Sequence, residues 1–233
     1  MPLKVVFFDL IGALVDPDAL MPCYAESLAQ TLGARFGGDA ARWQSAVRGV
    51  FADWDSFYAD LNLSGDDGIA DMWEGMYRVT RGYFRLADMP EPDQAALTAL
   101  SRSLPGDAAA ACHALLPGAP DALNRLGAAG IRCGVTTWLT ADHARGILRG
   151  GGALSLIDAP ILTPETVERF ERDQTYFEIA ARRAGVDPES CLLISARTDA
   201  LETARAVRMG TAHIEREMAL LDVIKAALTH SSP

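Results

Sequence analysis

Short apolar runs alternate with helical patterns along most of the chain. The first run, VVFF at residues 5–8, leads into Asp9, a turn glycine and a further apolar pair. Later runs of the same kind, bounded by Gly, Pro, Asp or Ser, cover residues 130–138, 156–163, 190–196 and 211–215. Segments between them, such as PDALNRLGAAG and QTYFEIAARRAG, carry apolar residues at helical spacing. Strands that alternate with helices in this way predict an α/β fold with a parallel sheet.

The stretch between the first and second apolar runs contains helical patterns only. Its predicted helices, separated by Gly, Pro and Asp, cover residues 18–34, 39–62, 66–87 and 92–103. The motif LPGAP at 116–120 then returns the chain to the sheet. We therefore predict a core domain of residues 1–15 and 114–233, with a helical domain of residues 16–113 inserted after the first strand.

Polar residues stand where three of the predicted strands end. They are Asp9, Thr136 and the polar residues of the loop 195–202. Ligands of open parallel sheets bind beyond the carboxyl ends of the strands. The sequence therefore predicts that these residues gather at one site.

Composition narrows the classes of partner. The 233-residue chain has a net charge of -10 and no basic run, which argues against nucleic acid. No apolar stretch approaches the roughly 18 residues that cross a bilayer, and no signal-peptide pattern is present, so we expect no membrane partner and a cytoplasmic location. The sequence indicates no oligomeric state. No CxxC pair occurs, and the expected form is a structural thiol in a reducing compartment for Cys23, Cys112, Cys133 and Cys191.

The order of these segments resembles the haloacid dehalogenase (HAD) superfamily. The resemblance rests on the strand that ends in Asp9, the helical insert, the segments LPGAPDALNRLGAAGIRCGVTT and FEIAARRAGVDPESCLLIS, and a helix that ends in RMG. It covers nearly the whole chain. It implies a Rossmannoid three-layer α/β sandwich with a parallel sheet, a helical cap domain inserted after the first strand, and a hydrolase with an aspartate nucleophile.

The first two motifs of the family are partly kept. The resemblance places the nucleophile at Asp9, whereas Ile11 occupies the position at which the family's phosphatases carry an aspartate as general acid. An isoleucine cannot protonate a leaving group, so ordinary phosphate-ester hydrolysis is not expected. Thr136 matches the Ser or Thr that binds the substrate's anionic group in the family. Thr137 follows it, and Trp138 is a candidate apolar wall of the ligand pocket.

The third and fourth motifs are altered in charge. Glu171 occupies the position of the family's lysine, and the only two lysines of the chain lie near its ends. Arg197 stands where the family has its first metal-binding acid. A guanidinium at that position argues against a stable Mg²⁺ site, so no cofactor is favoured. Asp199 and Glu202 leave a distorted Mg²⁺ site as the alternative.

The two charge changes are explained together by one reversed ion pair. We predict that Glu171 and Arg197 pair beside Asp9, with Arg197 acting as the cation for Asp9 or for an anionic ligand. The alternative is unconstrained drift, in which Glu171 points into solvent.

Two functions are compatible with this sequence. The first is a dehalogenase-like, metal-independent hydrolase in which Asp9 attacks an electrophilic carbon or phosphorus of a small anionic molecule. A halogenated or otherwise activated small carboxylic acid suits it better than a phosphate ester, because the family's dehalogenases work without metal and without an acid at residue 11. Catalytic roles fall to Asp9, Thr136 and Arg197, and substrate-binding roles to Ile11, Thr137, Trp138 and Glu171. The second is a catalytically inactive HAD-like protein that serves as a ligand-binding or protein-interaction module.

Overall fold

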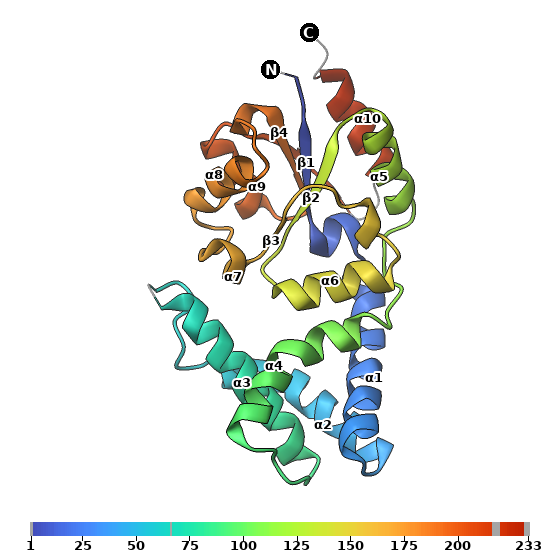
Figure 1. The fold of residues 1–233 in the computed structure, drawn as a ribbon, viewed down its shortest axis with the longest axis vertical. Coiled ribbons are helices and arrows are strands. Elements are labelled where there is room, and N and C mark those ends of the chain that lie inside the picture. Colours follow the sequence, from blue (N-terminus) through green and yellow to red (C-terminus); the bar gives the residue numbers. More distant parts are fainter. Residues whose placement is uncertain (1, 66, 216–219, 231–233) are drawn as a thin grey trace.

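The core of the protein is a five-stranded parallel sheet with helices on both faces (Figure 1). The structure is a computed structural model, and it describes residues 2–65, 67–215 and 220–230. The strand order is β3-β2-β1-β4-β5. The strands are β1 Val5–Asp9, β2 Arg132–Thr136, β3 Ile161–Leu162, β4 Cys191–Ser195 and β5 Gly210–His213. The predicted α/β fold with a parallel sheet is confirmed.

Strand β1 is central because both of its faces are apolar. Val6 and Phe8 pack into the core beneath one helical layer, and Val5 and Phe7 into the core beneath the other. The first layer is made by α5 Ala119–Ala128, α6 Ala141–Gly150 and α10 Leu220–His230. The second is made by α7 Pro164–Val167, α8 Gln174–Arg183 and α9 Thr198–Ala206. Burial on both faces gives β1 its continuous apolar run.

Between β1 and β2 the chain forms a helical insert with an apolar core of its own, built around Trp43, Leu32 and Phe84. Its helices are α1 Pro17–Phe36, α2 Ala40–Ala52, α3 Gly68–Leu86 and α4 Gln94–Ala109. Figure 1 shows the insert below the sheet, on the side where α6 lies. The predicted helix 39–62 ends at Ala52, and a short 3-10 turn Trp54–Phe57 follows it.

Helix α4 of the insert packs directly on α6 of the core. Gly106 and Gly146 meet there, and a Cβ on Gly146 would collide with the carbonyl oxygen of Gly106. A Cβ on Gly106 would in turn collide with the backbone of Asp142. Two glycines therefore allow the backbones of the two helices to touch, which fixes how the insert sits on the core.

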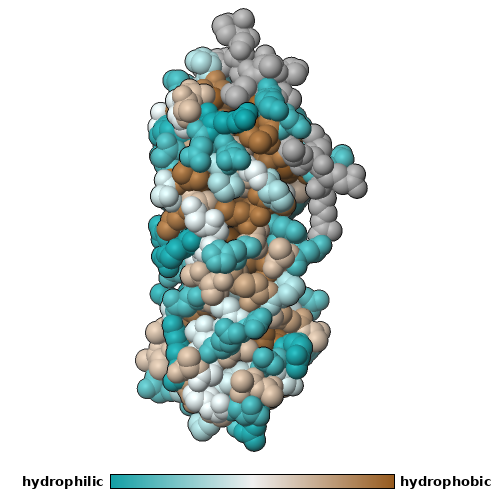
Figure 2. All heavy atoms as spheres, turned by 90° about the vertical axis from the view of Figure 1, so that its right-hand side faces the viewer, coloured by the Kyte–Doolittle hydropathy of each residue, from teal (hydrophilic) through white to brown (hydrophobic). Residues whose placement is uncertain are grey.

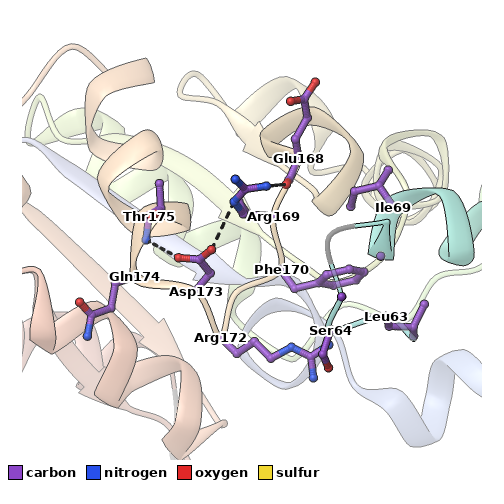
Figure 3. A pocket seen from close by; sticks show the side chains of 12 residues that line it. Leu63, Ser64, Ile69, Glu168, Arg169, Phe170, Arg172, Asp173, Gln174 and Thr175 are labelled. Carbon is purple, nitrogen blue, oxygen red and sulfur yellow. Dashed lines mark hydrogen bonds and ion pairs between the residues drawn. The ribbon is translucent and has the colours of Figure 1, made fainter. Parts of the chain in front are cut away.

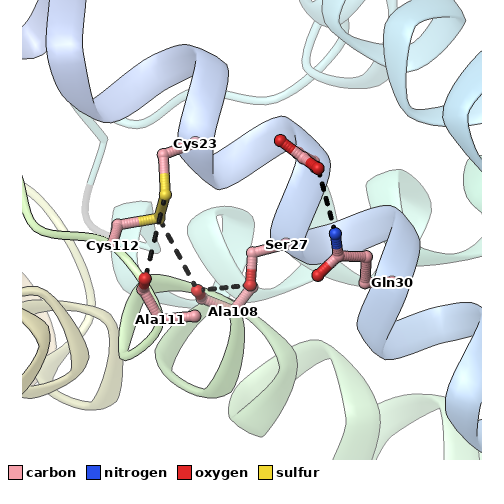
Figure 4. Close-up of a disulfide and its surroundings, with 7 residues drawn as sticks. Cys23, Ser27, Gln30, Ala108, Ala111 and Cys112 are labelled. Carbon is pink, nitrogen blue, oxygen red and sulfur yellow. Dashed lines mark hydrogen bonds between the residues drawn. A yellow bond between two sulfur atoms is a disulfide. The ribbon is translucent and has the colours of Figure 1, made fainter.

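A disulfide joins the two ends of the insert (Figure 4). Cys23 of α1 and Cys112, just after α4, are linked across a sequence separation of 89, with their Cα atoms 5.7 Å apart. Beside them, the Ser27 hydroxyl donates to the Ala108 carbonyl over 2.7 Å. The expectation of four structural thiols is wrong for this pair. The two cysteines are 89 residues apart and are brought together by the packing of α1 against the end of the insert, so no spacing along the chain indicates the bond. Cys133 and Cys191 are free and buried, as expected.

Figure 2 shows hydrophilic and hydrophobic residues interspersed over one face of the protein. Within the described ranges, none of the helices has the length and hydropathy that crossing a bilayer requires.

Candidate active site

Three polar side chains are buried together where the central strands end. The β1–β2 register sets Asp9 opposite Thr136, and β4, on the other side of β1, ends at Ser195. Asp9 is 1% exposed, and the other two are fully buried. Buried polar side chains at the carboxyl edge of a parallel sheet mark the place where such folds bind ligands.

A tight turn after β1 brings the next loop close to Asp9. The turn spans Leu10–Leu14, and Gly12 within it has a φ of +91°, a conformation that favours glycine. A Cβ at Gly12 would lie 3.1 Å from the Cβ of Ala196. Ile11 is partly exposed, and its backbone N–H lowers the pKa of Asp9. Glycine is therefore needed for the β1 turn to lie against the β4–α9 loop.

The two carboxylate oxygens of Asp9 have different surroundings. Oδ2 accepts a hydrogen bond of 2.7 Å from the Ser195 hydroxyl, whose oxygen accepts a bond of 2.9 Å from the backbone N–H of Arg197. Oδ1 is buried and makes no hydrogen bond of ordinary geometry with the described residues. Asp9 is thus held through one oxygen, while the other is available to an incoming group.

The ion pair predicted from the exchanged charges is present. Arg197 Nη1 lies 2.6 Å from Glu171 Oε2, and the Glu171 side chain is only 2% exposed. Arg197 also makes a fork with Asp199, at 3.2 Å from Nε to Oδ1 and 2.9 Å from Nη2 to Oδ2. The guanidinium therefore serves two carboxylates already. These bonds use three of the five N–H donors of the guanidinium, so two remain for its predicted role as the cation for a ligand.

Burial shifts both acids of the site in the same direction. It raises the pKa of Asp9 to about 6, against the lowering effects of the Ser195 hydrogen bond and the Arg197 charge. Burial, and then the charge of Asp9, raise the pKa of Glu171 to about 7, while Arg197 and the nearby Thr136 hydroxyl lower it. The site therefore disfavours two ionised carboxylates, and Glu171, with the higher pKa, keeps its proton to higher pH than Asp9 does.

The donor set around Asp9 suits Mg²⁺ poorly. The Arg197 guanidinium lies in the middle of the acids, Asp199 is tied to it, and Glu202 is exposed on α9. Within the described part of the chain, no group of three or more His, Cys, Asp or Glu side chains is placed to hold a metal. Magnesium prefers an octahedron of oxygen ligands, which this arrangement does not offer.

The residues after Thr136 have separate surroundings. Thr137 is fully buried, and its hydroxyl accepts a hydrogen bond of 3.2 Å from the N–H of Leu139. Trp138 is 51% exposed, unusual for a large apolar side chain. Their substrate-binding roles stay predictions. The Thr136 hydroxyl is buried, lies near Glu171 and makes no hydrogen bond of ordinary geometry with the described residues, so it can bond to a ligand.

Ser195 was predicted to lie at the site only as the first residue of the loop 195–202, and no contact with Asp9 was predicted for it. The sequence signal was its position at the end of the apolar run SCLLIS. Its bond to Asp9 joins residues 186 apart in the chain, which no local pattern reveals.

A pocket of about 660 Å³ lies beside the loop that carries Glu171 (Figure 3). Its walls come from residues 63–65 and 68–69 of the insert and from residues 168–170 and 172–175 of the core. In Figure 3, Arg172 and Phe170 extend toward the insert, with the guanidinium 5.5 Å from the ring centre. Glu171 does not line the pocket, because its side chain turns inward to Arg197.

Comparison with known proteins identifies the family. The family model of the haloacid dehalogenase-like hydrolases matches residues 3–208. Among curated protein sequences, none matches the chain significantly.

Solved structures of that kind share the fold at low identity. The L-2-haloacid dehalogenase from Xanthobacter autotrophicus with chloropropionic acid covalently bound is 16% identical, with a TM-score of 0.54 over 99% of this chain and 85% of that one. A HAD phosphatase from Thermococcus onnurineus is 19% identical, with a TM-score of 0.55 over 93% and 88%. The HAD-hydrolase YfnB from Bacillus subtilis, bound to magnesium, is 17% identical, with a TM-score of 0.59 over 98% and 100%.

Proposed function

The chain belongs to the haloacid dehalogenase-like hydrolases, and we propose that it hydrolyses a small organic anion through a covalent ester on Asp9, without a metal ion. The substrate class that suits the site best is a halogenated, or otherwise activated, small carboxylic acid. The observation that carries this proposal is the position of Asp9, which is held through Oδ2 by Ser195 and keeps Oδ1 free.

In the first step, Oδ1 of Asp9 attacks the carbon that bears the leaving group. The carbon–halogen bond breaks, the halide leaves with the electron pair, and an ester forms. In the second step, water adds to the ester carbonyl, releases the hydroxy acid and restores the Asp9 carboxylate. Because a halide leaves as an anion, the first step needs no proton donor, which agrees with Ile11 at the position of the missing acid.

Charge is the main obstacle to this reaction. Two unit charges of like sign at 4 Å repel by about 4 kcal/mol when the effective dielectric constant is near 20. A proton on Glu171, whose pKa is higher than that of Asp9, would remove one negative charge from the site while Asp9 stays ionised. Arg197 supplies a cation through the two N–H donors that its bonds to Glu171 and Asp199 leave free, and the Thr136 hydroxyl supplies a hydrogen bond.

We assign the insert, residues 16–113, the role of a cap over a core formed by residues 1–15 and 114–233. Support comes from its separate apolar core and from the pocket whose walls are drawn from both parts. Such a cap would exclude water from the ester until hydrolysis.

A substrate panel tests the proposal. Phosphate esters, phosphonates and 2-halo acids are assayed with and without Mg²⁺, on the natural chain and on Asp9→Asn. Turnover of 2-halo acids that is abolished by the substitution and unaffected by Mg²⁺ is the expected result. Incorporation of solvent ¹⁸O into the Asp9 carboxylate during turnover supports the ester, and turnover that requires Mg²⁺ contradicts the proposal.

One observation favours a second function. Arg197 already pairs with Glu171 and Asp199, so its charge is balanced within the protein and no substrate anion is needed to balance it. A catalytically inactive module that binds a small anion or another protein would keep these bonds. Absence of turnover over the whole panel, together with binding of 2-halo acids or hydroxy acids by calorimetry, would favour this second function.

A further inference from the structure

We propose that Glu171 is the base that activates water for hydrolysis of the Asp9 ester. This inference rests on the proposed function. It gives the site a proton acceptor at the position that a lysine occupies in the family.

The geometry around Glu171 suits this role. Its Oε2 is anchored by Arg197 Nη1 over 2.6 Å, which fixes the carboxylate. Its Oε1 is buried and makes no hydrogen bond of ordinary geometry with the described residues, and the same is true of Thr136 Oγ1 and Asp9 Oδ1. The Thr136 hydroxyl lies near Glu171 and lowers its pKa. Buried polar atoms are normally satisfied by protein or by water. These three can each bond to a water or to a substrate atom that enters the site.

Other side chains near Asp9 are less able to accept a proton. Ser195 already donates to Asp9, and the hydroxyl of Tyr176 donates to the Leu162 carbonyl over 2.8 Å. Asp199 is largely exposed and is held in the fork with Arg197. Asp9 itself carries the ester at this stage. Of the other acids that the structure describes at this site, Glu171 is the one that is both buried and open at one oxygen.

The reaction itself would prepare Glu171 for the second step. The charge of Asp9 is one cause of the raised pKa of Glu171. Ester formation removes that charge, while the positive charge of Arg197 remains. Glu171 then loses its proton more readily, so it becomes a base at the stage at which one is needed.

The proton movements balance. Glu171 takes a proton from water as the water oxygen adds to Cγ of Asp9. The tetrahedral adduct then collapses, the product oxygen leaves, and it receives the proton from Glu171. The new carboxylic acid of Asp9 releases its proton to solvent. The sum is ester plus water giving hydroxy acid, the Asp9 carboxylate and one proton.

The test follows the ester directly in Glu171→Gln, which keeps the side-chain size and an oxygen for Arg197. Each protein is mixed with 2-chloropropionate, quenched at intervals and examined by intact mass. We expect Glu171→Gln to accumulate the ester on Asp9 and to turn over about 10²–10⁴-fold more slowly than the natural chain. Asp9→Asn should form no adduct, and Glu178→Gln, a change of an exposed glutamate on α8, should behave as the natural chain does.

Three outcomes would overturn the inference: hydrolysis of the ester at the natural rate by Glu171→Gln, failure of a folded Glu171→Gln to form the ester, or loss of ester hydrolysis in Glu178→Gln as well. If Glu171→Gln does not fold, Glu171→Asp replaces it, and slowed ester hydrolysis with ester formation intact is the expected result. A natural chain that forms no adduct and turns over no 2-halo acid refutes the proposed function itself. The inference alone fails only where the natural chain does form the ester.

Discussion

Arg197 Nη1 lies 2.6 Å from Oε2 of Glu171, and the glutamate is 2% exposed whereas the arginine is 34% exposed. The carboxylate therefore depends on this one cation, because desolvation of a charge is costly unless a partner compensates it. In the family pattern, a lysine and an acid occupy these two positions. The pair in this protein has the opposite polarity.

The polarity of the pair can be reversed experimentally. Glu171→Lys and Arg197→Asp are each expected to lower the free energy of unfolding by roughly 2–4 kcal/mol, since each leaves two like charges together at a buried position. The double variant should recover part of that loss, because it restores an opposite-charge pair. Urea unfolding of the four proteins gives the coupling energy, and simple additivity of the two single effects would show that the residues do not act as a pair.

The same double variant addresses the metal question. Combining Glu171→Lys with Arg197→Asp removes the guanidinium from among the acids of the site and adds a carboxylate at the position that it occupied. Calorimetry should then detect Mg²⁺ binding in the double variant and none, or much weaker binding, in the natural chain. Equal binding by both proteins would contradict the view that Arg197 blocks the metal position.

The sequence allowed this pair to be predicted because its two members sit at fixed positions of a known motif order. Strands β1, β2 and β4 were also predictable, since their apolar runs and polar ends are local signals. Strand β3 is only Ile161–Leu162 within the predicted 156–163, because the pairing that limits its length comes from a neighbouring strand.

Other features could not be predicted because they join distant parts of the chain. The Ser195–Asp9 hydrogen bond and the Cys23–Cys112 disulfide each depend on how elements pack, which spacing along the chain does not show. The pocket beside residues 168–175 likewise needs the insert as its second wall. Local patterns therefore indicated the strand ends of the site, and tertiary packing supplied the rest.

The pH dependence of stability should reflect the raised pKa of Asp9. Its pKa is about 6 in the folded protein and near its ordinary value of 3.8 when the chain is unfolded. A folded-state pKa above the unfolded one means that the folded state holds the proton more tightly, so this contribution to stability is full below about pH 4 and is lost as the pH rises through about 6.

Asp9→Asn removes the titrating carboxyl, and with it the loss of stability that accompanies its ionisation. Relative to the natural chain, the variant should gain stability as the pH rises from about 4 to 7, by roughly 2–3 kcal/mol for a shift of this size. Urea unfolding at several pH values in this window measures the difference, and Asp121→Asn, which changes an exposed carboxyl on α5, serves as the control. A constant difference between Asp9→Asn and the natural chain would contradict the raised pKa.

The disulfide should stabilise the insert by closing a loop of the chain. For a sequence separation of 89, the chain-entropy model gives about 4–5 kcal/mol relative to the reduced protein. Reduction should therefore lower the unfolding temperature, and Cys23→Ser/Cys112→Ser should match the reduced protein and respond no further to reductant. Thiol titration in denaturant distinguishes the forms, because the oxidised chain exposes two thiols, those of Cys133 and Cys191. Four thiols in air-oxidised protein would contradict the disulfide and support the four structural thiols expected from the sequence.

The contact between α4 and α6 gives the last prediction. Gly146→Ala places a Cβ against the backbone of Gly106, where no flexible side chain can move aside, so the helices must separate. Such overpacking costs about 1–3 kcal/mol, which lowers the unfolding temperature by a few degrees in a protein of this size. Gly127→Ala on α5 is the matched control, since its Cβ would meet nothing within 4 Å and alanine favours the helix. If Gly146→Ala is as stable as Gly127→Ala, the insert is not seated on the core through these two glycines. If it is less stable and also hydrolyses its substrate more slowly, the seating of the insert matters for the reaction at Asp9.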